Sequence, residues 1–304
     1  MAHPLHTLGY RMLKTSLASE HSEQNHPATL SRRGFLLMAA TLSSCSAAGP
    51  APGVDPGKTT RNTHYRTPSL LGPVPRNPDM ALSSDFSNTP GVSYSRVLVA
   101  GNMIAMTFDD GPHPQNTPRL LNILRARNIK ATFFVIGNCV DLYPQVVRRT
   151  VADGHEIGNH TYSHRLLSKL SDSETSMELS RCRDAVVRAV GVAPQVMRPP
   201  YGGLLQRQRE NIHREFGYPT ILWSVDPLDW KRPGPSVVTS RILHGTTPGA
   251  IILAHDLHAS TVDAMPATLD SLLRRGFQFV TVSQLLAMKS STASAQAAAT
   301  RENS

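Results

Sequence analysis

The strongest constraint on the fold is a regular alternation of strand-like and helix-like segments that runs from residue 102 to residue 288. Short apolar runs of strand length are separated by longer segments, such as 117–127, in which apolar residues recur every three or four positions. Strict alternation of this kind favours a parallel sheet, either open or closed into a barrel. In both architectures the active site collects at the C-terminal ends of the strands. Functional residues are therefore expected where the apolar runs end.

The individual elements follow from the same periodicity. The expected strands cover residues 102–108, 131–136, 195–197, 220–225, 250–254 and 277–280. The expected helices cover residues 117–127, 144–152, 172–190, 205–215, 236–243, 262–274 and 282–288. The longest of these helices has its own start and stop signals, because Ser171 or Asp172 can cap its first turn and Gly191 can close it.

The first 44 residues have the features of an export signal. Residues 31–36 match the twin-arginine pattern, and a short apolar stretch follows them. The sequence Leu-Ser-Ser-Cys that ends at Cys45 is similar to a lipoprotein signal-peptidase site, which predicts lipidation of Cys45 and membrane anchoring on the periplasmic or cell-wall side. The alternative is a soluble secreted protein that is cut near Ala47 or Ala48.

Composition divides the rest of the chain into a tether, one folded domain and a tail. Residues 45–95 are rich in Pro, Gly, Ser, Thr and Asn and lack apolar periodicity, which is typical of a flexible linker. Residues 290–304 are rich in Ala, Ser and Thr and are expected to be disordered. One domain over 96–289 remains, and it is expected to act as a monomer without a protein partner.

Charge and cysteine content limit the classes of partner. The chain has a formal net charge of +9, but its basic residues are scattered, so nucleic acid is not an expected partner. A hydrophobic fraction of 40% excludes a disordered chain. Cys139 and Cys182 remain after Cys45, and they either pair or stay as buried free thiols. Neither has a partner at zinc-site spacing.

Two clusters of polar residues stand at the ends of apolar runs. Asp109 and Asp110 precede a Gly-Pro turn, where one carboxylate can bind a cation while the other moves protons; a solvated turn is the alternative. His160 and His164 are four residues apart, a spacing that places both imidazoles on one face of a helical turn. With one of the aspartates they form a two-histidine, one-carboxylate set that leaves metal positions open for water and substrate.

Residues 102–288 closely resemble the NodB-homology polysaccharide deacetylases, which form carbohydrate esterase family 4. The resemblance rests on five motifs in the family's order, at residues 109–110, 160–164, 198–202, 226–230 and 253–255. It implies a distorted (β/α) barrel that hydrolyses N-acetyl groups on an amino-sugar polymer, with peptidoglycan expected first and chitooligosaccharide or exopolysaccharide next. It also implies that Asp109 is the general base and that Asp110, His160 and His164 bind a divalent metal. Zinc is the expected metal, and cobalt, nickel or iron also suits these ligands.

The last three motifs supply the other expected site residues. Arg198 can pair with Asp109 and hold it ionised. The backbone N–H of Tyr201 follows two prolines that lack a donor, so it suits an oxyanion. Asp229 can pair with His255 and raise its pKa, which keeps the imidazolium available as a general acid. An apolar slot for the acetyl methyl group is expected from the side chains of Tyr201, Trp230 and Leu253.

Three other functions stay open. An O-acetyl esterase acting on xylan would use the same site, and a catalytically inactive polysaccharide-binding module would use the same fold. A two-histidine, one-carboxylate iron oxygenase shares the ligand count, but its ligands normally lie on β-sandwich strands. Four other histidines are expected to be structural or exposed: His113, His155, His244 and His258.

Overall fold

The computed structural model describes residues 91–288. The predicted export signal, Cys45 and nearly all of the predicted tether lie outside the described residues, and so does the predicted tail. Among the described helices, none has both the length and the apolar character needed to cross a bilayer.

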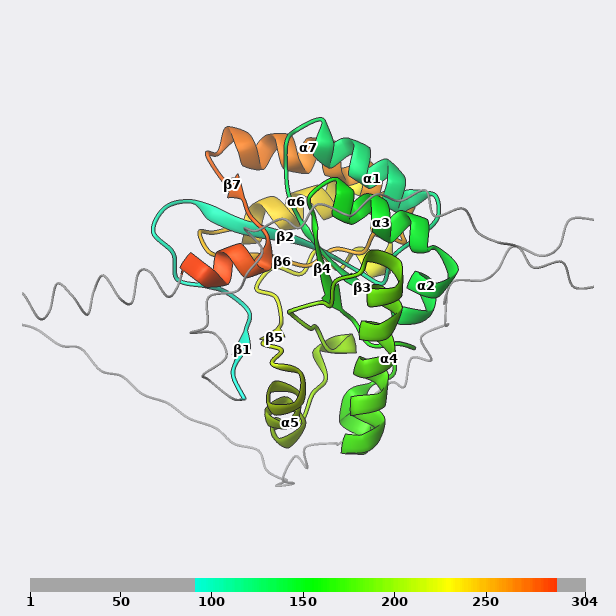
Figure 1. Ribbon diagram of the computed structural model, residues 1–304. Coiled ribbons are helices and arrows are strands. Elements are labelled where there is room, and N and C mark those ends of the chain that lie inside the picture. The colour runs from blue at the N-terminus through cyan, green and yellow to red at the C-terminus, as the bar shows by residue number, and fades with distance from the viewer. Residues whose placement is uncertain (1–90, 289–304) are drawn as a thin grey trace, which may run out of the picture. The chain divides into compact units, whose positions relative to one another are not determined.

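A parallel sheet runs through the centre of the described domain (Figure 1). Its strands are β2 (Met103–Asp109), β3 (Thr132–Val135), β4 (Glu156–Asn159), β6 (Ile251–Ile252) and β7 (Gln278–Phe279), in the order β4-β3-β2-β6, with β7 also paired to β2. Five of the seven residues of β2 are apolar. Six of the seven are buried, and Met103 is the exception. A strand that is covered on both faces has such a near-continuous apolar sequence.

Single-residue bridges close this sheet into a distorted barrel. β1 (Ser93–Tyr94) pairs in parallel with β5 (Thr220–Ile221). Met197 bridges Asn159 of β4 to Thr220 of β5, and Val225 then bridges to Ile252 of β6. The circuit therefore returns to β2 through β6, which confirms the barrel expected from the sequence. Its weakest part is the stretch from β4 to β6, where isolated bridges replace ladders.

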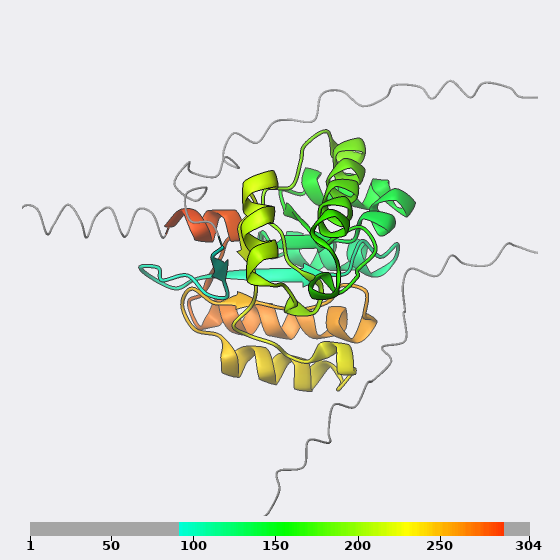
Figure 2. The same cartoon turned by 90° about the horizontal axis from the view of Figure 1, so that it is seen from below.

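Helices surround the barrel. Their bounds are α1 (Asn116–Arg125), α2 (Gly137–Leu142), α3 (Pro144–Ala152), α4 (Asp172–Val190), α5 (Gln206–Phe216), α6 (Pro235–Gly245) and α7 (Ala259–Arg274), and residues 282–288 are also helical. Figure 2 shows α6 and α7 side by side on one side of β2, with α4 and α5 on the other. These helices cover the strands from both directions, so the free strand ends are the place where polar side chains can gather.

The longest helix shows how local sequence sets its bounds. Ser171 caps α4 by accepting a hydrogen bond from the backbone N–H of Glu174, while the Glu174 carboxylate accepts one from the Ser171 N–H at 2.9 Å. This reciprocal pair is a capping box. Gly191 ends the helix in the left-handed conformation, with φ of 76°. Both predicted end signals are confirmed.

Two predictions about the elements are wrong. Ser93 and Tyr94, which composition placed in the tether, form β1, because burial of Tyr94 and pairing with β5 order a segment too short to show periodicity. The run 195–197 forms only a bridge at Met197 instead of a strand. The sequence analysis also did not detect α2, whose six residues make fewer than two turns.

Cysteine and surface charge complete the description. Cys182 is a free, buried thiol, so it does not pair with Cys139. Burial raises the pKa of Cys182 to about 12, which makes it unreactive.

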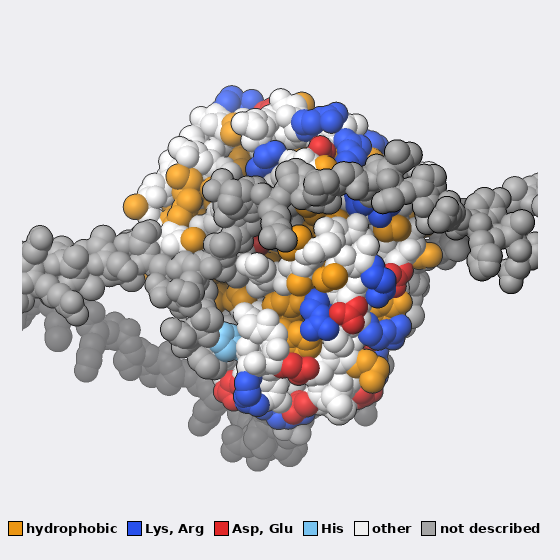
Figure 3. Space-filling model, in the orientation of Figure 1, with side chains coloured by type: hydrophobic (Ala, Val, Ile, Leu, Met, Phe, Trp, Pro, Cys, Tyr) orange, Lys and Arg blue, Asp and Glu red, His pale blue; other side chains and the backbone are white. Residues whose placement is uncertain are grey.

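On the face in Figure 3, Lys and Arg side chains of the described residues are interspersed with Asp and Glu and form no continuous basic area. The charge is scattered there, as the sequence predicts.

Candidate active site

The two adjacent carboxylates lie at the C-terminal end of β2. Asp109 is the last residue of the strand and is buried, and Asp110 follows it with a positive φ of 72°. Successive side chains of a regular strand point to opposite faces. The left-handed backbone at Asp110 breaks that alternation, so both carboxylates approach the ring of His160: Asp109 Oδ2 lies 3.7 Å and Asp110 Oδ1 lies 3.4 Å from its Nε2.

The two predicted histidine ligands lie on a loop after β4, so the predicted helical turn is wrong. Thr161 and His164 have φ values of 68° and 58°, which no right-handed helix contains. The loop nevertheless brings both rings to one carboxylate, since His164 Nε2 lies 3.2 Å from Asp110 Oδ1. The two histidines do meet at one carboxylate, as predicted, but the conformation of the loop brings them there and not the geometry of a helix.

Glu178 of α4 holds this loop in place. Its Oε2 accepts hydrogen bonds from the backbone N–H groups of Tyr162 (3.0 Å) and Ser163 (2.8 Å), and its Oε1 accepts one from the Ser163 hydroxyl (2.6 Å). The residue is buried. Sequence reasoning missed Glu178, although an acid on the buried face of an amphipathic helix is a signal that could have identified it.

The residues present fit a divalent cation. Asp110 Oδ1 is buried, yet no N–H or O–H of the described residues donates to it. His160 Nδ1 lies 2.7 Å from the Arg198 carbonyl oxygen, so this nitrogen carries the proton and Nε2 keeps its lone pair toward Asp110. The ligand atoms of Asp110, His160 and His164 all lie within 4.8 Å of one another. Two imidazole nitrogens and a carboxylate oxygen that converge in this way are typical of a metal centre.

Arg198 pairs with Asp109, as expected from the sequence. Its Nη1 donates to Asp109 Oδ1 and to the Thr107 hydroxyl, both at 2.7 Å, and its Nη2 donates to the Leu222 carbonyl at 3.0 Å. The side chain of Arg198 is 0% exposed. A fully buried guanidinium requires a counter-charge, and Asp109 provides it. The second oxygen of Asp109 remains directed toward the cluster of histidines.

Asp229 and His255 form the second predicted pair. Asp229 Oδ1 lies 2.8 Å from His255 Nδ1, and its Oδ2 accepts from the His255 backbone N–H (2.8 Å) and the Thr261 hydroxyl (2.9 Å). Burial alone would lower the pKa of His255, but the hydrogen bond and charge of Asp229, together with the charges of Asp110 and Asp109, raise it to about 10. The imidazolium therefore keeps its proton at neutral pH.

The other expected site residues lie around this centre. Tyr201 is 58% exposed, and its ring packs edge-on to His164 at 4.8 Å between centroids. Among the described residues no acceptor takes the Tyr201 backbone N–H, as an oxyanion donor requires. Trp230 is 50% exposed and follows Asp229, whereas Leu253 is buried. The apolar slot between these side chains stays a prediction.

Asp256 is a second buried acid that sequence reasoning missed. It follows His255, accepts a hydrogen bond from the Thr117 hydroxyl, and lies so close to Gly111 that a Cβ there would collide with its carboxylate. Burial raises the pKa of Asp256 to about 7. An aspartate in a polar loop gives no sequence signal of burial. Its position ties the loop after His255 to the turn after Asp110.

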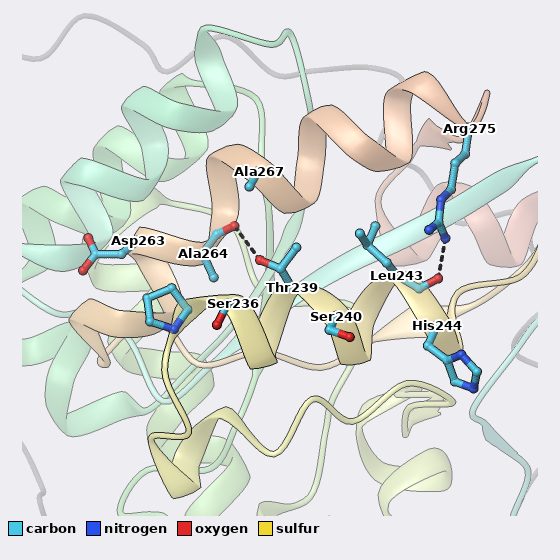
Figure 4. Close-up of a pocket in the computed structure, with 10 residues that line it drawn as sticks. Ser236, Thr239, Ser240, Leu243, His244, Asp263, Ala264, Ala267 and Arg275 are labelled. Atoms are coloured by element: carbon cyan, nitrogen blue, oxygen red, sulfur yellow. Dashed lines mark hydrogen bonds between the residues drawn. The ribbon is translucent and has the colours of Figure 1, made fainter.

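A separate cavity lies between α6 and α7 (Figure 4). Its volume is about 620 Å³, and Thr239 of α6, Asp263 of α7 and Arg275 are among its lining residues. Hydrogen bonds from Thr239 to Ala264 and from Arg275 to Leu243 cross between the two helices. None of the expected site residues lines this cavity. The expected site residues gather instead at the strand ends.

Changing Glu178 to Gln is expected to weaken metal binding by roughly 10–100-fold, the usual effect of losing a group that orients a metal ligand. The amide can accept from only one of its two terminal atoms, so the loop between His160 and His164 loses part of its support. Isothermal titration of the metal-free protein with Zn²⁺ measures the change. Glu174→Gln on the same helix is the control, and an unchanged affinity for Glu178→Gln would contradict the positioning role.

Comparison with known proteins gives a consistent result. Residues 98–221 match the family model described as polysaccharide deacetylase. A chitooligosaccharide deacetylase from Bradyrhizobium sp. is 38% identical over 197 residues, which cover 60% of this chain and 90% of that protein. The peptidoglycan-N-acetylglucosamine deacetylase PgdA of Listeria monocytogenes is 41% identical over 186 residues. That match covers 61% of this chain but only 39% of PgdA, so this chain matches less than half the length of that relative.

Solved structures agree with this match. The Bc1960 peptidoglycan N-acetylglucosamine deacetylase has a TM-score of 0.62 and 34% identity, covering 64% of this chain and 92% of that one. A chain described as a pseudoenzyme of carbohydrate esterase family 4 from Bacillus anthracis also has a TM-score of 0.62, at 29% identity, covering 66% and 70% of the two chains. The fold is thus shared by proteins described as enzymes and by one described as a pseudoenzyme.

Proposed function

The chain belongs to the polysaccharide deacetylase family, and we propose that it is a metal-dependent hydrolase that removes N-acetyl groups from an amino-sugar polymer. One observation carries this proposal. A complete metal-ligand set lies beside a buried carboxylate paired with a cation and beside a protonated imidazole paired with a carboxylate. The residues concerned are Asp110, His160, His164, Asp109, Arg198, His255 and Asp229.

The metal site has a defined chemical role in this proposal. Asp110, His160 and His164 would hold the divalent cation, with zinc expected first. When bound, such a cation polarises a water molecule and the acetyl carbonyl. The identity of the metal is part of the proposal, since these ligands also suit cobalt, nickel or iron.

The chain's own residues then divide the proton transfers between them. Asp109 accepts a proton through Oδ2 as the water oxygen attacks the carbonyl carbon, while Arg198 keeps the other oxygen fixed. The Tyr201 N–H stabilises the negative charge that develops on the carbonyl oxygen. His255 donates its proton to the amide nitrogen as the C–N bond breaks. The products are acetate and a free amine.

An amino-sugar polymer suits the surroundings of these groups. The half-exposed rings of Tyr201 and Trp230 come from separate loops near His164 and Asp229, where a sugar ring can lie against an aromatic face. Peptidoglycan N-acetylglucosamine is the first substrate we propose, with chitooligosaccharide or exopolysaccharide next. The relatives named peptidoglycan-N-acetylglucosamine and chitooligosaccharide deacetylase support this order.

The alternative functions differ in what they need. An inactive binding module has no use for a buried Asp109–Arg198 pair and a His255–Asp229 pair held beside three ligands. An iron oxygenase of the two-histidine type places its ligands on a β-sandwich, whereas these ligands lie on βα loops of a barrel. An O-acetyl esterase would use the same groups, so experiment must separate it from an N-deacetylase.

Acetate release from a panel of glycans tests the proposal. We expect the metal-loaded protein to release acetate from N-acetylated peptidoglycan strands or chitooligosaccharides faster than from O-acetylated xylan. His164→Ala serves as the control and is expected to release none above background. Faster release from xylan would replace the proposal by an esterase, and no release from any glycan would favour a binding module.

A further inference from the structure

The turn Asp229–Lys231 fixes two basic side chains next to the catalytic histidine. While the Asp229 carboxylate holds His255, its backbone carbonyl accepts a hydrogen bond from the Arg232 N–H at 2.8 Å. The Lys231 N–H donates to the Leu228 carbonyl at 3.1 Å. Asp229 therefore orients His255 through its carboxylate and holds the backbone of the two cations through its carbonyl oxygen.

Both cations are available to a ligand. Lys231 and Arg232 are exposed, and neither forms an ion pair with a carboxylate anywhere in residues 91–288. Lys231 Nζ lies 4.9 Å from the centre of the half-exposed Trp230 ring, so a positive charge lies next to an aromatic surface. Such a combination suits a sugar that carries an anionic group.

The turn that carries both cations lies beside the reacting centre, because its first residue, Asp229, contacts His255 at 2.8 Å. The ring of His258 lies 6.1 Å from that of His255, centroid to centroid. Burial lowers the pKa of His258; the negative charge of Asp229 opposes this shift, and the positive charges of His255 and Arg232 add to it. Arg232 is thus within electrostatic reach of the imidazole next to the general acid.

The cation next in sequence to the ligand His164 already has a carboxylate partner. Arg165 directly follows the ligand His164, but it is paired with Glu174 at 3.2 Å. Lys231 and Arg232, by contrast, have no carboxylate partner among residues 91–288. An anionic group on a bound glycan would therefore be attracted to the turn beside His255.

We propose that Trp230, Lys231 and Arg232 form a subsite for a carboxylate-bearing sugar that neighbours the acetylated sugar on the His255 side. The proposal rests on the proposed function and deepens it, because it names an acidic glycan as the substrate class. The Trp230 ring lies against the sugar, and the Arg232 guanidinium and the Lys231 ammonium bind the carboxylate.

The test compares two substrates that differ in one group. The acidic substrate is a tetrasaccharide of alternating N-acetylglucosamine and N-acetylmuramic acid, and the neutral one is the same tetrasaccharide with its carboxyl groups reduced to alcohols. The readout is the ratio of kcat/KM for the acidic over the neutral substrate, measured by acetate release at low salt. We expect a ratio of about 10 or more for the unmodified protein, since charge-assisted hydrogen bonds contribute at that scale.

The double variant Lys231→Gln/Arg232→Gln is expected to lower this ratio about tenfold, mainly through KM on the acidic substrate. Arg274→Gln is the charge-matched control. It removes an exposed cation at the C-terminal end of α7, whereas Thr261 near the start of the helix contacts Asp229. We expect the control to keep the full ratio, because 13 residues of helix separate positions 261 and 274, a span of roughly 20 Å.

Two outcomes would overturn the subsite. One is a ratio near one for the unmodified protein, and the other is an equal ratio for the unmodified protein and the double variant. In both cases acetate release itself continues, so the proposed function would stand without the subsite. Absence of acetate release from both substrates would instead contradict the proposed function.

Discussion

Replacing Asp109 by Asn is expected to lower kcat for N-acetyl hydrolysis by roughly 10²–10⁴-fold, the contribution typical of a general base. The amide keeps the shape of the side chain but cannot accept a proton from water. Metal content should not change, because Asp110 rather than Asp109 belongs to the compact ligand set. Steady-state acetate release and elemental analysis of the same preparation measure both quantities.

Asp110→Asn is the matched control for this experiment. The two positions are adjacent, yet their roles differ, so Asp110→Asn should lose the metal together with activity. Loss of the metal by Asp109→Asn, with retention by Asp110→Asn, would show that ligand and base are assigned the wrong way round. Folding is checked by thermal unfolding, since Asp109 also neutralises the buried Arg198.

His255→Ala is expected to cost a similar factor of roughly 10²–10⁴ on an amide substrate. The loss should be much smaller on an aryl acetate, because a phenolate leaves without being protonated whereas an amine does not. Parallel assays with a chitooligosaccharide and an aryl acetate measure this difference. Equal losses on both substrates would remove His255 as the general acid and leave it a positioning or oxyanion role.

Asp229→Asn tests the same assignment through pH. The general acid must be protonated, so activity falls as pH rises through the pKa of His255, which lies at about 10 with Asp229 present. Without the Asp229 charge, only the charges of Asp110 and Asp109 still oppose the effect of burial, so the pKa of His255 falls and the alkaline limb of the pH–rate profile should move to lower pH. An alkaline limb in the same place for both proteins would contradict the pairing as the cause.

The sequence was informative where local pattern and final structure agree. β2 ends at Asp109, as the end of its apolar run predicts, and α4 begins after Ser171 and ends at Gly191. These features depend on residues close together in the chain. The parallel α/β class follows from the βα alternation, since a parallel sheet needs a crossover between successive strands. The choice of a barrel over an open sheet came from the family resemblance.

Features set by distant contacts were not predictable in this way. The loop between His160 and His164 takes its left-handed conformations while Glu178 holds its backbone from another helix, so helix spacing gave the wrong local structure. β1 exists because it pairs with β5, more than a hundred residues later in the chain. The burial of Asp256 against Gly111 likewise joins two distant loops.

Acetate release as a function of bound metal tests the central claim most directly. The protein is first stripped by a chelator, and metal content is verified by elemental analysis. Zn²⁺ is then added back in steps while acetate release from an N-acetylated glycan is measured. We predict that activity is absent in the stripped protein and rises in proportion to bound metal, reaching its maximum at one ion per chain, as the single set Asp110, His160 and His164 requires. Full activity in the verified metal-free protein would contradict the account.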